Sequence, residues 1–164
     1  MSQLPVRIIR SPRRRSTLQA TVVDGTIEVR VPAGMPREEE RRAVETLVDR
    51  VRRRSTAEHI DLTERARDLA ERFSLPSPEE IRWSDRQQRR WGSCTPGTRS
   101  IRISTRLAAT PPFVLDYVLV HELAHLVVPG HGPRFRALVD EYPLAERARG
   151  YLLALTQSST EAGP

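Results

Sequence analysis

The 164-residue chain contains no lysine, only one cysteine and no long apolar run. A single cysteine, Cys94, excludes an intramolecular disulfide framework and is typical of a reducing compartment. The apolar runs are only a few residues long, whereas a membrane-spanning helix needs about 20. The N-terminal arginines are not followed by an apolar segment, so we expect no signal peptide. The sequence therefore predicts a cytoplasmic protein with no membrane segment.

All 27 basic residues are arginines, and the formal net charge is +6. Arg13–Arg15 and Arg52–Arg54 are the two triplets. Arginine suits phosphate binding, but a biased composition or a solvated face explains such runs equally well. No aromatic residues interleave the triplets, so stacking on bases has no support. Charge alone leaves a nucleic acid or nucleotide partner open without predicting one.

By length the chain is one domain, which we expect over residues 1–155. Residues 1–35 predict short N-terminal β-strands, residues 36–75 predict a helical segment, and residues 79–155 predict the catalytic core. The small polar residues 156–164 predict a disordered tail. This mixture of strands and helices indicates an α+β fold.

Apolar alternation predicts the strands, and apolar spacing of three and four residues predicts the helices. Asp24-Gly25 is a typical hairpin turn between two of the strands. The expected strands are 6–9, 18–23, 27–31, 81–84, 90–94 and 100–104. The expected helices are 37–54, 60–73, 111–128 with Thr110 as N-cap, 133–142 and 144–155.

The helix expected over 111–128 is apolar nearly all round and should be buried. Its strongly polar side chains are Asp116, His121, Glu122 and His125. Each would cost about 1–3 kcal/mol if it were buried without a partner. Residues four apart share a helix face, so the two histidines can direct their imidazoles at one point, with Glu122 beside it. In zinc hydrolases, two such nitrogens hold the metal and the carboxylate handles the proton of a water.

A third histidine, His131, follows the second after six residues. An H-E-x-x-H match arises by chance about 0.008 times per chain of this composition, and the third histidine lowers this to about 0.0002. Three protein ligands plus water are typical of catalytic zinc. Pro129-Gly130 provides the turn that returns His131 to the ion, but Val128 stands where the long metzincin motif has glycine. A downstream carboxylate, Glu141 or Glu146, is the alternative third ligand.

Three other polar residues have two interpretations each. Asp116 orients a ligand imidazole or, as we favour, lies on the helix surface. Arg134 holds an anionic or carbonyl group of the substrate, or is simply solvated. Cys94 has no second cysteine and no adjacent histidine, so we expect a small buried residue rather than a metal ligand or nucleophile.

The segments Trp91-Gly92-Ser93-Cys94, Arg106-Leu107, His121–Leu126 and His131–Phe135 resemble the YgjP-like metallopeptidase domain family, which is grouped with the WLM and SprT-like zincins. The early arginine triplet and hairpin are also similar to that family, so the resemblance extends over about residues 5–142. HELAH is shared by many zincins, whereas the R-W-G-S-C segment ahead of it is more specific.

The resemblance implies a zincin-like α+β fold with a small sheet against the HExxH helix. It also implies Zn²⁺ on His121, His125 and His131, with Glu122 as general base. Residues 91–94 would lie on or beside the strand that flanks the cleft. The chain departs from the family where Gly132 precedes Pro133 and Arg136 follows Phe135, positions at which the family commonly has serine and tryptophan.

We expect a zinc-dependent metallohydrolase, with a metallopeptidase acting on peptide or protein as the main hypothesis. Glu122 would be catalytic, and Trp91, Ser93 and Arg134 are candidates for the substrate side. One alternative is a nucleoside triphosphate pyrophosphatase using the same metal, although no Gly-rich phosphate loop or acidic magnesium cluster is present. Another is a nucleic-acid-associated binding module, or a peptidase that acts on DNA-bound proteins.

Overall fold

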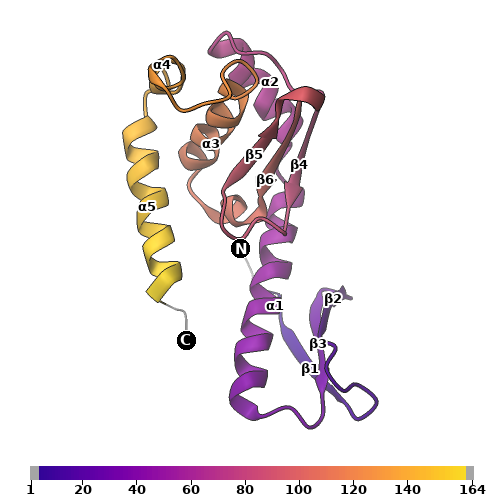
Figure 1. Ribbon diagram of the computed structural model, residues 1–164. Helices are drawn as coiled ribbons and strands as arrows, with labels where there is room; N and C mark the ends of the chain where they lie inside the picture. Colours follow the sequence, from indigo (N-terminus) through magenta and orange to yellow (C-terminus); the bar gives the residue numbers. More distant parts are fainter. Residues whose placement is uncertain (1–3, 162–164) are drawn as a thin grey trace. The chain divides into compact units, whose positions relative to one another are not determined.

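The computed structural model describes residues 4–161 (Figure 1). The chain divides into two compact units, with the boundary in the sequence between Thr56 and Ala57. Each unit has a three-stranded sheet and a hydrophobic core of its own. The sequence predicts one domain over residues 1–155, and the structure adds that this stretch contains two separately packed cores. No helix within residues 4–161 combines the length and the apolar character that crossing a bilayer requires.

The first unit begins with β1 (Val6–Ser11), β2 (Gln19–Val23) and β3 (Thr26–Pro32). The strand order is β1-β3-β2, with β1 parallel and β2 antiparallel to β3. The β2–β3 turn has φ values of 47° at Asp24 and 72° at Gly25. This left-handed backbone is the one a tight hairpin turn requires, which confirms the hairpin predicted at Asp24-Gly25.

α1 (Arg37–Glu58) supplies the helical side of the first core. Ile27, Val29 and Val31 of β3 have no exposed surface, and Val44 and Val48 of α1 are buried with them. Alternate residues share one face of a strand, and residues four apart share one face of a helix. The apolar faces of β3 and α1 therefore pack against each other.

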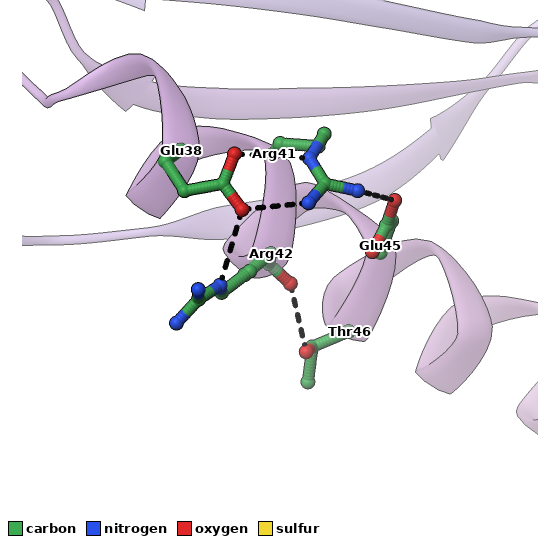
Figure 2. A network of polar contacts seen from close by, with 5 residues as sticks. All are labelled: Glu38, Arg41, Arg42, Glu45 and Thr46. Carbon is green, nitrogen blue, oxygen red and sulfur yellow. Dashed lines mark hydrogen bonds and ion pairs between the residues drawn. The ribbon is translucent and has the colours of Figure 1, made fainter. Parts of the chain in front are cut away.

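The exposed face of α1 carries ion pairs, which Figure 2 shows from close by. Arg41 donates to Glu38 over 2.6 Å and to Glu45 over 3.4 Å, and Arg42 lies 3.4 Å from Glu38. Exposed pairs of this kind contribute about 0–1 kcal/mol each. Arg41 and Arg42 of this helix therefore belong to an exposed, charge-paired surface.

The second unit holds the predicted site. Its helices are α2 (Leu62–Arg72), α3 (Pro112–Ala124), α4 (Pro133–Asp140) and α5 (Ala145–Glu161), and its strands are β4 (Glu80–Ser84), β5 (Gly92–Thr95) and β6 (Ser100–Ser104). The short 3-10 helices η1 (Pro96–Thr98) and η2 (Thr105–Ala109) follow β5 and β6. The strand order is β4-β6-β5, so β5 is an edge strand.

α3 is the central helix of the second unit, with β5 on one side and α5 on the other (Figure 1). Leu119, Val120 and Leu123 have no exposed surface, and they pack into a core shared with α2, β6 and α5. The prediction that this helix is buried, in an α+β fold, is confirmed.

Helix ends differ from the prediction most at α1, α3 and α5, and α1 continues to Glu58 rather than residue 54. α3 is capped by Pro111 rather than Thr110, whose hydroxyl donates to the Leu107 carbonyl instead. α3 also ends at Ala124 rather than Val128, because tight turns take over from His125 onward. α5 continues to Glu161, since no proline or glycine interrupts residues 156–161. The expected disordered tail is thus helical up to that point, and 162–164 lie outside the described residues.

Candidate metal centre

Three imidazoles converge where α3 ends and α4 begins. His121 lies in the last turn of α3, His125 is its C-cap, and His131 follows on the returning loop. The Nε2 atom of His131 is 3.2 Å from Nε2 of His125 and 3.3 Å from Nε2 of His121. Within residues 4–161, His121, His125 and His131 form the one cluster of potential metal ligands whose donor atoms lie close enough to bind the same ion.

A backbone contact orients one of these rings. His125 Nδ1 lies 3.1 Å from the Val128 carbonyl oxygen, to which it donates when the proton is on Nδ1. That tautomer leaves the Nε2 lone pair directed at the other two histidines. A carbonyl on the far nitrogen of a ligand histidine is the usual way in which proteins orient such a ring.

The ring of Phe135 in α4 packs against all three imidazoles. Its ring centroid lies 4.4 Å from that of His125, 4.7 Å from that of His131 and 4.8 Å from that of His121. The side chain is only 3% exposed. Because Phe135 is itself held in the core, it restricts the tilt of each ring.

Glu122 is buried beside the three imidazoles, against the backbone of β5. It is 6% exposed, and a Cβ placed on Gly92 would lie 2.5 Å from its Oε1 atom. Burial raises the pKa of Glu122 to about 7, partly opposed by the positive charge of Arg90. A carboxylate that titrates near neutrality can both accept and return a proton.

Burial also keeps His121 uncharged. Burial lowers the pKa of His121 to about 4, and the charges of His125, His131 and Arg149 lower it further. The pKa of His125 is likewise lowered, mainly by burial. Neutral imidazoles are the form that binds a metal.

The site opens into a cavity of about 730 Å³. One wall is β5 with the residues just before it, and another is the face of α3 that carries His121. Its lining residues are Arg90, Trp91, Gly92, Ser93, Cys94, Pro96, Tyr117, Val118, His121, Glu122, His125, Pro129, His131, Arg149 and Leu152.

Two of the three candidates for the substrate side line this cavity. The guanidinium carbon of Arg106 lies over the Trp91 ring, 3.8 Å from the ring centroid. The Ser93 hydroxyl accepts a 2.6 Å hydrogen bond from the Gln87 side-chain amide. Arg134 is exposed at the start of α4 and is not among the lining residues. Of the two interpretations of Arg134, this position favours the solvated arginine.

The alternative third ligands lie apart from the histidines. Glu141 is exposed, and Glu146 is 87% exposed and pairs with Arg149. Neither belongs to the ligand group that contains His131. Asp116 neither orients an imidazole nor faces solvent freely, because it accepts a 2.5 Å hydrogen bond from Arg65 of α2.

Cys94 is half-buried on the cavity wall, and it is the free cysteine that the sequence predicts. Burial, together with the charge of Glu122, raises the pKa of its thiol to about 11. The thiol is therefore protonated at neutral pH, which disfavours the role of nucleophile.

Sequence reasoning missed three residues of the site: Phe135, Tyr117 and Arg149. Tyr117 precedes His121 by four residues, so helical spacing alone could have placed it on the same face. Arg149 comes from α5, and no local pattern connects it to the histidines.

The donor set fits a zinc ion. Zinc favours nitrogen ligands in a tetrahedral arrangement, and three converging Nε2 atoms leave a fourth position for water. A site of hard oxygen ligands, which would suit magnesium or calcium, is not formed here by the residues in the cluster.

Two of three comparisons with known proteins gave a match. The family model described as "YgjP-like, metallopeptidase domain" matches residues 39–152. A search of curated proteins found no match. Among solved structures, the chain is similar to the crystal structure of the metallopeptidase zymogen of Methanocaldococcus jannaschii jannalysin, with 16% identity and a TM-score of 0.50. The match covers 60% of this chain and 97% of that one, and at this identity it shows a common fold.

Proposed function

The chain belongs to the YgjP-like metallopeptidase domain family, and on that premise we propose that it cleaves peptide bonds with zinc held by His121, His125 and His131. The observation that carries this proposal is the convergence of the three Nε2 atoms next to the buried carboxylate of Glu122. The substrate would be a peptide or a protein.

When bound, zinc supplies Lewis acidity, which lowers the pKa of a water to about 7 and polarises the carbonyl group under attack. Glu122 acts as the general base: it takes the proton of the attacking water and later gives it to the leaving amine. Its raised pKa suits both steps. Glu122 is 6% exposed and lines the cavity, so its carboxylate borders the space in which the water would lie.

The edge strand β5 supports binding of an extended peptide. Among the strands of residues 4–161, β5 pairs with β6 alone, so its other edge is available to pair with a substrate strand. Because β5 lines the cavity, a strand added there would run past the three histidines. Trp91 and Ser93 would then contact the substrate near the reacting bond.

The decisive experiment compares the wild type with Glu122→Gln, both loaded with zinc, on fluorescein-labelled casein. We expect the variant to lose hydrolysis while it retains one zinc per chain, because the amide cannot accept the proton. Full activity in Glu122→Gln contradicts the assignment of the base.

The third ligand is tested by metal analysis of purified His131→Ala beside Glu146→Gln. We expect the first variant to lose metal and the second to keep it. Undiminished zinc in His131→Ala would move the third ligand elsewhere.

The two alternative functions are tested in parallel. Incubation of the zinc-loaded protein with nucleoside triphosphates should release no pyrophosphate. Binding to duplex DNA should be weak, whereas tight binding with a steep salt dependence would favour the nucleic-acid hypothesis.

A further inference from the structure

Tyr117 lies on the cavity wall one helical turn before His121. The two ring centroids are 6.2 Å apart, and the side chain of Tyr117 is 7% exposed. Residues four apart in a helix project from the same face, so the phenol and the metal-binding imidazole border the same space. The mechanism proposed above gives this buried hydroxyl no role.

The partner of the Tyr117 hydroxyl is Arg149 of α5. Its Nε donates to the phenolic oxygen over 3.0 Å. A hydroxyl that accepts in this way still has its own hydrogen to give. Within the part of the chain that the structure describes, no acceptor for that hydrogen is found.

Arg149 is already held by three partners, since its Nε atom and both terminal nitrogens each donate one hydrogen bond. Its two terminal nitrogens donate to Asp140 and to Glu146, and the hydrogen bond to Asp140 is the main reason why its pKa is raised. The guanidinium is therefore held in place and its charge is balanced. Both Tyr117 and Arg149 line the cavity, and the phenolic oxygen accepts from the guanidinium.

During peptide cleavage, the carbonyl oxygen under attack gains negative charge. Donors that already point at that oxygen stabilise the transition state more than the bound substrate. We propose that Tyr117 is a catalytic residue that donates a hydrogen bond to this oxygen, and that Arg149 is the positioning residue that holds and polarises the phenol. No proton is transferred, and the O–H bond of Tyr117 remains intact throughout. This inference rests on the proposed peptidase function.

The test compares Tyr117→Phe with a matched control, Tyr142→Phe. Tyr142 is also buried and packs against Tyr117, but its hydroxyl donates to the Phe113 carbonyl and it does not line the cavity. With zinc-loaded protein and a single peptide chosen from the casein fragments, we expect Tyr117→Phe to lower kcat about 100-fold and leave KM nearly unchanged. Tyr142→Phe should keep the wild-type kcat. A Tyr117→Phe variant with a kcat within threefold of the wild type overturns the inference.

A second readout does not depend on turnover. Calorimetry measures the binding of a phosphinic peptide, whose phosphinyl oxygens imitate the charged carbonyl oxygen. We expect Tyr117→Phe to weaken this binding at least about tenfold, with no change in Tyr142→Phe. Equal affinities in all three proteins would refute a donor role. A wild type that cleaves no peptide would defeat the proposed function instead, so the two failures are distinguishable.

The role of Arg149 is tested through its coupling to Tyr117. Arg149→Met should lower kcat about tenfold in the wild-type background and have little effect in Tyr117→Phe, because both changes act on the same hydroxyl. Arg147→Met is the control and should leave kcat unchanged, since Arg147 is an exposed arginine of the same helix that lies over the Phe113 ring and does not line the cavity. Additive losses in the double variant would show that Arg149 acts independently of the phenol.

Discussion

Gly92 and Glu122 are in such close contact that no side chain fits between them. A Cβ on Gly92 would lie 2.5 Å from Oε1, 2.8 Å from Cγ and 2.9 Å from Cδ of Glu122. The glycine of the R-W-G-S-C segment therefore lets the backbone of β5 approach the carboxylate directly. The strand that flanks the cavity also sets the position of the proposed base.

Replacing this glycine tests that relationship. We expect Gly92→Ala to displace the Glu122 carboxylate and lower kcat about 100-fold, because small misplacements of a reacting group are that costly. Zinc content should stay at the wild-type level. Gly97→Ala is the control, since a Cβ there meets no atom within 4 Å. Wild-type kcat in Gly92→Ala would contradict the assigned position of the base.

Phe135→Leu tests the support beneath the imidazoles. Loss of the flat ring should let the three histidines tilt and lower zinc affinity about 10-fold to 100-fold, the range found for residues that orient ligands. Competition with a fluorescent chelator measures this affinity. Phe73→Leu, a core change away from the histidines, should lower thermal stability and leave the affinity unchanged.

The Arg65–Asp116 pair joins α2 to α3 without touching the metal centre. Asp116→Asn should lower the free energy of unfolding by about 1 kcal/mol, since the amide oxygen still accepts from Arg65 but the negative charge of the pair is lost. Zinc affinity should not change, which separates this role from that of a ligand-orienting carboxylate. Urea titration makes the measurement, and Asp68→Asn on the exposed face of α2 should have almost no effect.

The Cys94 thiol should react slowly with iodoacetamide. Its pKa is raised to about 11, so the thiolate that reacts is scarce at pH 8 in the folded protein. We expect alkylation about 100-fold slower than in the urea-unfolded chain, where the pKa returns to about 8.5. The rate of alkylation of the folded protein should rise with pH up to about 11. Mass spectrometry measures this rate. A folded rate equal to the unfolded one would contradict the raised pKa.

The sequence alone determined most of the local structure and the histidine set. The β6 strand at 100–104, the hairpin turn at Asp24-Gly25 and the burial of α3 all follow from period, turn chemistry and apolar content. His121 and His125 could be paired from their spacing because a helix repeats every 3.6 residues. Such patterns are local, so the structure that they predict can be inferred without knowledge of the rest of the chain.

Tertiary structure decided which distant residues complete the site. Arg149 reaches Tyr117 from α5, and Gly92 meets Glu122 from β5, contacts that no spacing in the sequence encodes. Closeness in the sequence does not guarantee a place in the site either: Arg134 follows His131 by three residues, yet it does not line the cavity. Which side chains share a cavity depends on how whole helices and strands pack. That packing is set by the sum of many apolar contacts rather than by any short motif.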